Sequence, residues 1–563
     1  MLTITLPIVL ALSAPQEPKT TTQLVPLQHI CTNELEQDGL PWGSLMRWRH
    51  NLRADLVLGD DGLGAITPDA IVEALYGFAA EAIDEERLFL QAIDNNLLVV
   101  GDPTLVARVR QHIQEAAGIL ARPMQVELAV WDAADREAAA TILDKQAFAE
   151  WAANRTPLWR AVSTANAGQP LIIENMTWSR YVRGIEIEVA QKKTMTSPST
   201  DRYGQGGAAM VRAYSLVGSS DFAVHMQFAA ASRHGTVNTL QTGMPGAPDI
   251  ELPRLDSFFG TCSGRIANGG ALATTMQGNA VSGGQITVTL RIVSSDAPPP
   301  LSDPRTALIP VGALISEGLN YQAALPDVHA EDGLLSIEQE SSYGCIPSDN
   351  LQDLIAGVLA AADEEGDHEL KLGGGYLFLR SSQTGIQRAR ELIQTLQDNM
   401  LRNVEIRHSG ELQSQPGDPA NATFRPELHT LTVPTLLGRE AAVYRLHETN
   451  IVANIFVEVA PEAGSLVPSM QLLQSGTWFR ARTVPVGESL HANLDLLSVI
   501  APIPAMRSVM PGGGVLMQAQ VSSTRLDHNG ILTSGTAIEH GDGPRVTLNG
   551  QTYRSRMTTS FSR

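Results

Sequence analysis

The same stretch of sequence occurs twice in this chain, once at Gly64–Gln114 and again at Gly344–Gln394. The two copies align without a gap, and 14 of the 51 positions are identical, where roughly three would be expected from ordinary composition. In the first copy the identical residues are Gly64, Ile66, Asp69, Gly77, Ala80, Ala82, Glu85, Leu90, Leu97, Thr104, Arg108, Arg110, Ile113 and Gln114. This unit is longer than a solenoid repeat, so it indicates duplication of a whole module.

Both copies show the same order of secondary-structure signals. Apolar residues at helical spacing predict a first helix, which begins near Asp69 in one copy and near Asp349 in the other. A short strand, a tight turn, a second strand and a second helix follow. The helical apolar positions are Ile71, Leu75, Phe78, Ala82, Val106, Val109, Ile113, Ala116 and Leu120, then Leu351, Ile355, Val358, Ala362, Ile386, Ala389, Ile393, Leu396 and Met400.

Strands are also predicted at both ends of each module. Ala54–Gly59 and Leu334–Gln339 precede the two units, and Met124–Trp131 and Asn403–Ser409 follow them. The resulting order, β-α-β-β-α-β, predicts a small sheet with two helices on one face.

The second part of each half also repeats, at a slightly shorter offset than the first part. Gly206 matches Gly476, and Arg212 matches Arg482. The matching segments alternate apolar and polar residues between Gly-rich turns, which predicts antiparallel β structure. The segment pairs are Ile185–Gln191 with Ile455–Pro461, Phe222–Phe228 with Ala492–Ser498, Ala267–Ala273 with Pro511–Met517, and Gln285–Ile292 with Thr552–Phe561.

Together the repeats predict an α+β protein built from two tandem copies of a small α/β module followed by an antiparallel β domain. The expected boundaries are 21–132 and 307–410 for the α/β modules, 133–294 and 411–563 for the β domains, and 295–306 for a Pro-rich linker. Residues 1–20 are expected to be a signal peptide and leader, because the apolar run Leu2–Leu12 meets a small-x-small pattern at Ala11–Ser13. A first strand is the alternative for this run.

Charge and composition disfavour several classes of partner. The net charge of −20 argues against nucleic acid and against an anionic membrane surface, because both are bound through basic patches. No internal segment reaches the ~18 continuous apolar residues of a membrane-spanning helix. Cys31, Cys262 and Cys345 have no metal-binding spacing, so we expect buried thiols, with one disulfide as the alternative in an exported protein.

Motifs for catalysis are missing from the sequence, so we expect no enzymatic activity, no cofactor and no bound metal. A hydrolase whose site is scattered along the sequence is the alternative. Gly373–Gly375 and Gly512–Gly514 lack the Lys-Ser/Thr of a phosphate-binding loop and are expected to be hairpin turns. The acidic segment Asp363–Leu370, which contains His368, is expected to be a solvated loop rather than a cation site. His50 lies among arginines, where an anion site is the alternative to an ordinary surface patch.

Four arginines recur at matching positions of the second helix in both modules. They are Arg108, Arg110, Arg388 and Arg390. A contact between subunits and a solvated helix face with long aliphatic stems both remain open for them.

The stretch Asn96–Val130 resembles the part of bacterial secretins in which a ring-building module leads into the β domain. The matching residues include Asp102, Pro103, Arg122, Pro123 and Val126. The β half also resembles that family, through Gly206, Phe222–Phe228, Pro253 and Arg265–Thr275. The resemblance covers about residues 66–292 and, more faintly, 346–561.

The resemblance to the secretins of type II and type III secretion systems implies a non-enzymatic, exported protein of the periplasm or outer membrane of a diderm bacterium. It also implies self-association, as a ring or channel component of protein secretion, with other envelope proteins as partners. Membrane insertion is not implied, because the stretch Gln191–Gly207 is polar. The alternative is a monomeric periplasmic or surface scaffold that uses the same modules for binding. Two copies in one chain represent either two fused subunits or two stacked rings.

Overall fold

The computed structural model describes residues 20–27, 30–31, 68–132, 140–190, 193–233, 235–241, 248–277, 285–295, 299–316, 345–361, 368–414, 427–460, 463–500, 505–508, 515–518, 522–533, 535, 537–548 and 551–562. The expected signal peptide, the expected strands at 54–59 and 334–339, the turn at 512–514 and His50 lie outside the described residues. Strands make up most of the described structure and six helices accompany them, so the predicted α+β class is confirmed.

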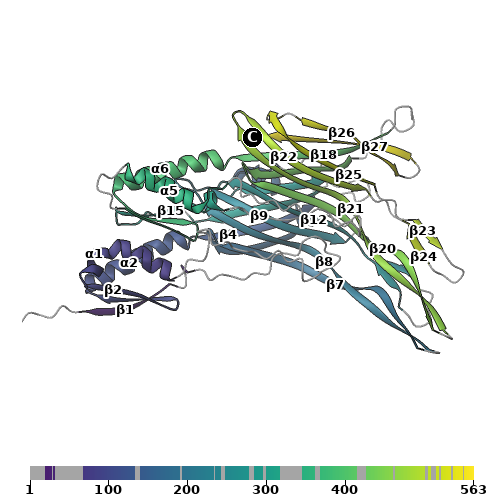
Figure 1. Ribbon diagram of the computed structural model, residues 1–563, viewed down its shortest axis with the longest axis horizontal. Helices are drawn as coiled ribbons and strands as arrows, with labels where there is room; N and C mark the ends of the chain where they lie inside the picture. The colour runs from purple at the N-terminus through teal and green to yellow at the C-terminus, as the bar shows by residue number, and fades with distance from the viewer. Residues whose placement is uncertain are drawn as a thin grey trace, which may run out of the picture.

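The first α/β module is a three-stranded antiparallel sheet with two helices on one face (Figure 1). Its strand order is β1-β3-β2, and β2 and β3 are joined by a two-residue turn in which Asp94 has a φ of 50°. The predicted helical positions Ile71, Leu75, Val106 and Ile113 are buried against this sheet. The elements are β1 (Thr21–Pro26), α1 (Pro68–Asp84), β2 (Leu88–Ile93), β3 (Asn96–Gly101) and α2 (Pro103–Leu120).

The second α/β module has the same arrangement, with the strand order β15-β17-β16. Gly374 and Gly375 form the turn between β16 and β17 with φ values of 58° and 81°, which confirms the predicted hairpin. Short turns also correspond, because Ile30 and Cys31 donate to the Leu27 carbonyl as Leu314 and Ile315 donate to that of Val311. The elements are β15 (Thr306–Pro310), α4 (Gly312–Ile315), α5 (Ser348–Ala360), β16 (Glu369–Gly373), β17 (Tyr376–Arg380) and α6 (Gln383–Met400).

The expected place of the closing strand of each module is wrong. β4 (Pro123–Asp132) and β18 (Asn403–Ser414) do form strands, but they pair in a large sheet and not in the small one. The third strand of each small sheet is instead β1 or β15, which pairs with β3 or β17. The expected end of the first module at residue 132 therefore includes β4, a strand that belongs to the large sheet.

An eight-stranded antiparallel sheet extends across both halves of the chain. Its order is β25-β22-β21-β20-β12-β9-β8-β7, so four strands of each half occur in the same sequence of pairing. Figure 1 shows the long hairpins β7–β8 and β20–β21 reaching far beyond the other strands, away from the α/β modules. The strands are β7 (Pro170–Ala190), β8 (Lys193–Ser215), β9 (Phe222–Arg233), β12 (Arg254–Ile266), β20 (Glu440–Ala460), β21 (Ala463–Val486), β22 (Ser489–Ile500) and β25 (Ser522–Thr533).

A second large antiparallel sheet lies against the first and also crosses both halves. Its order is β26-β27-β18-β19-β13-β14-β4-β6, with β5 paired to β13 beside this path. Alternate residues of both sheets form one continuous apolar core. The remaining strands are β5 (Ile142–Leu143), β6 (Pro157–Asn166), β13 (Ala271–Gln277), β14 (Gln285–Ser294), β19 (Glu427–Leu436), β26 (Ala537–Leu548) and β27 (Gln551–Ser562).

Smaller elements complete the two β regions. The helix α3 (Lys145–Ala152) covers the outer face of β4 and β13, where Phe148 packs with Trp131. The pairs β10 (Asn238–Leu240) with β11 (Ile250–Leu252), and β23 (Ala505–Ser508) with β24 (Val515–Gln518), are short ladders. The expected match of Pro511–Met517 to Ala267–Ala273 is wrong, because β26 and not β24 occupies the place of β13.

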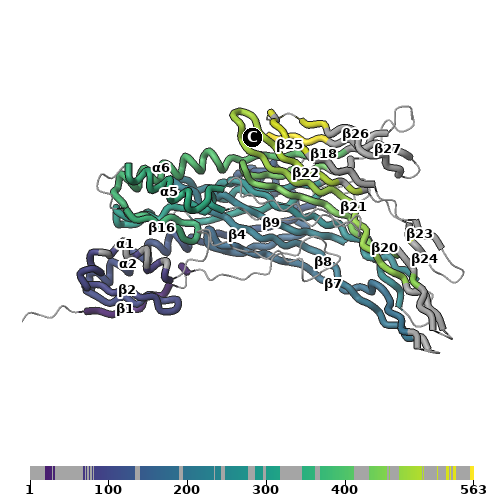
Figure 2. The backbone as a smooth tube through the Cα atoms, in the orientation of Figure 1, coloured from purple at the N-terminus to yellow at the C-terminus, as the bar shows by residue number. Residues whose placement is uncertain are grey.

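Figure 2 shows the two α/β modules at the same end of the molecule and the two β regions beside each other. The halves therefore lie side by side, which excludes an arrangement of stacked halves within one chain. No helix in the described part of the chain is both long and apolar enough to span a membrane.

Two glycines at matching positions are required by close backbone contacts in the long hairpins. Gly206 has a φ of 125°, and a Cβ at this position would overlap the carbonyl oxygen of Asn175. Gly476 is its counterpart in the repeat, and a Cβ there would overlap the carbonyl oxygen of Arg445. A side chain would therefore force apart β7 and β8, or β20 and β21.

We expect Gly206→Ala to lower the free energy of unfolding by about 1–3 kcal/mol, because the added Cβ meets backbone in a left-handed conformation. Urea and thermal unfolding followed by circular dichroism measure this loss. Gly184→Ala in β7 is the control, since no heavy atom lies within 4 Å of its added Cβ. Equal melting temperatures for the two variants would contradict the role of Gly206.

Candidate assembly interface

Two strand pairs join the halves of the chain. In the eight-stranded sheet, β12 pairs with β20 from Arg254 opposite Thr449 to Thr261 opposite Ala442. In the other large sheet, β13 pairs with β19, with Thr275 opposite Thr432. In each sheet the strands of the first half lie on one side of this pair, and the strands of the second half lie on the other. This junction is the best-defined candidate for an assembly interface.

Aromatic rings fill the junction on one face of the eight-stranded sheet. Phe259 of β12 stacks on Tyr444 of β20 with ring centroids 4.8 Å apart, and Tyr444 stacks on Trp478 of β21 at 6.4 Å. Phe259 and Tyr444 are fully buried. Such pairs contribute roughly 0.5–1.5 kcal/mol beyond the area that they bury, so the two halves are tightly packed here.

A buried carboxylate fixes the register of the same strand pair. Glu448 of β20 has no exposed surface, and both of its carboxylate oxygens accept hydrogen bonds. The Ser257 hydroxyl of β12 donates to Oε2 at 2.8 Å, and the Gln474 amide of β21 donates to Oε1 at 2.9 Å. A shift of the strand pair by one residue would remove the bond from Ser257 and leave one oxygen of the buried Glu448 carboxylate without this donor. The pairing therefore opposes a change of register.

A second group of charges lies one residue away on the opposite face. His447 Nδ1 is 3.0 Å from Asp256 Oδ1, and the carboxylate is almost fully buried. Burial holds the pKa of the nearby Arg445 guanidinium below its ordinary value, while Asp256 acts in the other direction. Asp256 is therefore the anion that offsets two potential cations at the junction.

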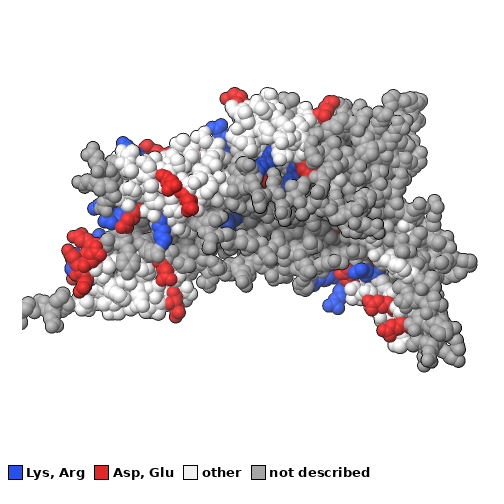
Figure 3. Space-filling view, viewed as in Figure 1, with Lys and Arg blue, Asp and Glu red and all other residues white. Residues whose placement is uncertain are grey.

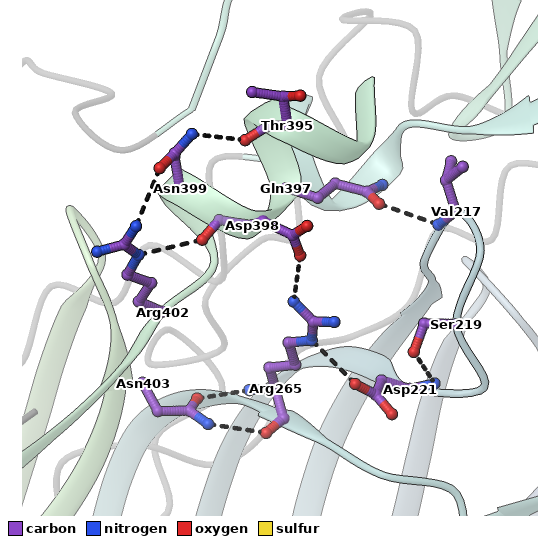
Figure 4. A network of polar contacts seen from close by, with 10 residues as sticks. All are labelled: Val217, Ser219, Asp221, Arg265, Thr395, Gln397, Asp398, Asn399, Arg402 and Asn403. Atoms are coloured by element: carbon purple, nitrogen blue, oxygen red, sulfur yellow. Dashed lines mark hydrogen bonds and ion pairs between the residues drawn. The ribbon is translucent and has the colours of Figure 1, made fainter. Parts of the chain in front are cut away.

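The second α/β module docks on the β region of the first half through Arg265 (Figure 4). Arg265 of β12 donates from Nε to Asp221 at 3.0 Å and from Nη1 to Asp398 of α6 at 2.9 Å. Burial acts to lower the pKa of Arg265, but the hydrogen bonds to Asp398 and Asp221 outweigh it and hold this pKa above its ordinary value.

Amide side chains extend this contact in both directions. Asn403 donates to the Arg265 carbonyl at 2.9 Å and accepts from its backbone N–H at 2.7 Å. Gln397 accepts from the Val217 N–H at 2.9 Å and donates to the Pro310 carbonyl at 3.1 Å. The Gln397–Val217 bond ties the end of α6 to the turn between β8 and β9, and the Asn403 bonds tie the start of β18 to β12 (Figure 4). The second half is therefore bound to the β region of the first at both places.

The two α/β modules also contact each other directly. The outer face of the second small sheet, with Leu308 and Tyr376, packs into the core formed by α1 and α2. The Tyr376 hydroxyl donates to the Ile119 carbonyl at 3.4 Å, and Glu115 accepts from the Ser302 N–H at 2.9 Å. Burial raises the pKa of Tyr376 to about 12. Helices of one module therefore cover the open sheet face of the other.

The residues considered for chemistry from the sequence do not converge. Asp102 is the N-cap of α2, where hydrogen bonds from Thr104 hold its pKa below the ordinary value. His368 borders residues 362–367, which lie outside the described part, and Arg108 and Arg388 are exposed. Among the described residues no group of His, Cys, Asp and Glu is arranged to hold a metal ion.

The three cysteines are free thiols in this structure. Cys262 is buried, and burial raises its pKa to about 12; the pKa of Cys31 is raised to about 11 by the same cause. On the face shown in Figure 3, acidic and basic side chains of the described residues are interspersed without a continuous basic patch.

The residues that hold the junction were not among those predicted from the sequence. Arg265, Asp398 and Glu448 occur only once, because their counterparts in the repeat are other residues, so the duplication gave no signal for them. The signal that exists is local: His447 and Glu448 are adjacent polar residues within an apolar strand.

No family model and no curated protein matches the sequence. Solved structures that match include the InvG secretin domain of the Salmonella SPI-1 injectisome, at 12% identity and a TM-score of 0.23, with 51% of this chain and 90% of that chain covered. The E. coli K12 type II secretion system secretin GspD matches at 8% identity and a TM-score of 0.19, over 97% and 90% of the chains.

The V. cholerae type IV competence pilus secretin PilQ matches at 11% identity and a TM-score of 0.17, over 38% of this chain and 72% of that chain. Superpositions with such low scores do not establish a shared fold. Any functional assignment therefore rests on the sequence and on the strand pairing and contacts within the chain itself.

We expect Asp256→Ala to destabilise the junction by about 1–3 kcal/mol, because it removes a buried carboxylate that lies 3.0 Å from His447 and acts on the buried Arg445. Hydrogen exchange of the amides in β12 and β20 measures the local loss of protection. The control is Glu85→Ala, which breaks an exposed pair with Arg87 and should change stability by less than about 1 kcal/mol. Unchanged protection in β12 and β20 would contradict this role of Asp256.

Proposed function

We propose that this chain is a non-enzymatic envelope protein that self-associates into a ring or channel component of a protein secretion machine. The proposed location is the periplasm or outer membrane of a diderm bacterium, with other secretion-system proteins as partners. The resemblance of Asn96–Val130 to secretins supports the secretion role, and the junction between the halves supports self-association.

One observation carries the proposal: both large sheets continue across the junction and end, among the described strands, at strands with one paired neighbour. Among the described strands, β7 and β25 end one sheet, and β6 and β26 end the other. Each terminal strand is the repeat counterpart of a strand that pairs at the internal junction. β7 corresponds to β20 and β6 to β19, while β25 corresponds to β12 and β26 to β13. A second chain can therefore extend both sheets by the pairing that already exists.

The contact proposed between chains is head-to-tail, because the two ends of each sheet present different strands. Such contacts form a closed ring when the rotation from unit to unit divides a full turn. Each chain contributes two side-by-side units, one from each half, so a closed ring would contain an even number of units. The proposed units are residues 21–294 and 307–563, each an α/β module with its β region, joined by the linker 295–306.

The monomeric scaffold is the less favoured alternative. Long, open strand edges in a soluble monomer are normally shortened, covered or carry several charges, because they template further pairing. β7 has 21 residues and forms a strand ladder only with β8 among the described strands, while its Val182 N–H donates to Glu251 of β11. The edge of β7 carries charges such as Glu174 and Arg180, as the edges of monomers do, so the ring is favoured by the match between terminal and junction strands and not by this edge alone.

We expect the purified full-length chain to form closed rings that are visible by negative-stain microscopy. Their mass, measured by mass photometry, should be an integer multiple of the 60.4 kDa chain, or of the mature chain if a leader is removed. Cell fractionation should place the protein with the envelope. A single species at the chain mass at all micromolar concentrations would overturn the ring proposal and favour the monomeric scaffold.

A further inference from the structure

Two exposed valines of the second half occupy positions whose counterparts in the first half are buried at the junction. Tyr214 and Leu216 at the end of β8 are 3% and 4% exposed, because they pack with Ala313 and Leu401 of the second module. Val484 and Val486 are their counterparts at the end of β21, and these are 38% and 46% exposed. The second half thus repeats an apolar contact surface that no third module covers among the described residues.

The open face of the first small sheet shows the same relationship from the other side. Leu24 is opposite Leu98 in β1 and β3, as Leu308 is opposite Phe378 in β15 and β17. Leu308 is 9% exposed because α1 and α2 cover it, whereas Leu24 is 53% exposed. Phe89, which lies in the next row of the same face, is also exposed. This face has no covering helices among the described residues.

The terminal strands follow the same rule. Val162 of β6 is 46% exposed, and its counterpart Thr432 in β19 is 2% exposed beside β13. Glu174 of β7 is exposed, while its counterpart Tyr444 in β20 is buried beside β12. The surfaces that differ in burial between the halves are therefore those that meet at the internal junction.

We propose that a second copy of this chain covers these surfaces, with its first half placed against the second half of its neighbour as the two halves are placed within one chain. The Leu24 face of one copy packs on α5 and α6 of the other. The turn at Ile30 and the end of α2 cover Val484 and Val486, as α4 and Leu401 cover Tyr214 and Leu216. This inference rests on the proposed function and names the surfaces through which it operates.

The strand register between copies follows from the pairings inside one copy. Phe259 is opposite Ala229 in β9, and Ser523 is opposite Val499 in β22, which is the counterpart of Ala229. Ser523 therefore holds the place of Phe259. Phe259 is opposite Tyr444, whose counterpart is Glu174. Position 523 of one copy is thus placed opposite position 174 of the next.

The contact between copies lacks the polar bonds of the internal junction. Glu448 has Trp178 as its counterpart, and Asp398 has Gly118. Arg265 has Asn529, because Ala223 opposite Arg265 corresponds to Asn493 opposite Asn529. The proposed contact is therefore held by backbone pairing and by the apolar surfaces at Leu24, Val484 and Val486, while the strand pair itself places Glu174 opposite Ser523.

The first test places charges on each apolar surface. We expect Val484→Glu with Val486→Glu, and separately Leu24→Glu with Phe89→Glu, to raise the protein concentration needed for assembly by at least about 100-fold, because assembly would bury unpaired carboxylates. Mass photometry over a dilution series measures this change. All four residues are exposed in the isolated chain, so its circular dichroism should be unchanged.

A matched control introduces the same charge on an exposed residue outside the proposed contact. Met195 is 70% exposed, in the part of the β7–β8 hairpin that extends past the strands paired between halves. Met195→Glu should assemble as the unmodified chain does. Assembly of both surface variants at the concentration of this control would overturn the inference, even where the unmodified chain forms rings.

The second test measures the register by disulfide formation between two different variants. Both carry Cys31→Ser and Cys345→Ser, and buried Cys262 is retained. A mixture of Glu174→Cys and Ser523→Cys should give a disulfide-linked dimer after mild oxidation. A mixture of Glu174→Cys and Thr524→Cys should not, because successive strand positions alternate between faces.

The outcomes separate the two proposals. Linkage of the first mixture alone supports the proposed register. Rings without linkage at position 174, or with stronger linkage in the second mixture, would overturn this inference and leave ring assembly standing. An unmodified chain that stays monomeric at all concentrations would overturn both.

Discussion

The structure depends on the backbone hydrogen bonds between strands that come from different halves of the chain. Each half supplies four strands to the eight-stranded sheet; in the other sheet the second half supplies four and the first half five, β5 included, and β12 with β20 and β13 with β19 make the two sheets continuous. Every strand has backbone N–H and C=O groups on both of its sides. The terminal strands of each sheet therefore have backbone groups on their outer side that require hydrogen-bond partners, as the junction strands do. The proposed assembly is therefore a continuation of the fold and not an addition to it.

Local sequence patterns predicted the elements well, because their signals lie within a few residues. The helices with Ile71 or Ile355 and the turn at Gly374 depend on helical periodicity and on glycine conformation, and both are present in the structure. Where each strand pairs was predicted less well. The strand at Pro123–Asp132 has an alternating pattern that is compatible with either sheet. In the structure it pairs with β14 and β6 of the large sheet.

The junction residues could not be predicted from the repeat, since they are positions at which the two halves differ. An alternating strand such as β7 or β20 has the same pattern whether its neighbour is present or not. Burial distinguishes them: Tyr444 is covered by β12, whereas the outer side of Glu174 has no described neighbour. Only a structure shows which copy of a surface is covered, and that comparison identifies the candidate interface.

The proposed junction between chains differs in polarity from the internal junction, and this difference would affect the order of the proposed assembly. Within one chain the halves are held at high effective concentration, so their pairing needs specificity more than strength. The buried Glu448 and the ion pairs of Asp256 and Arg265 provide it, because each is satisfied in one register. Between chains no tether exists, and a buried charge would add a desolvation cost to each encounter. Apolar surfaces such as Leu24 and Val486 avoid that cost. A folded chain would therefore close its internal junction first and present finished edges to its neighbours afterwards.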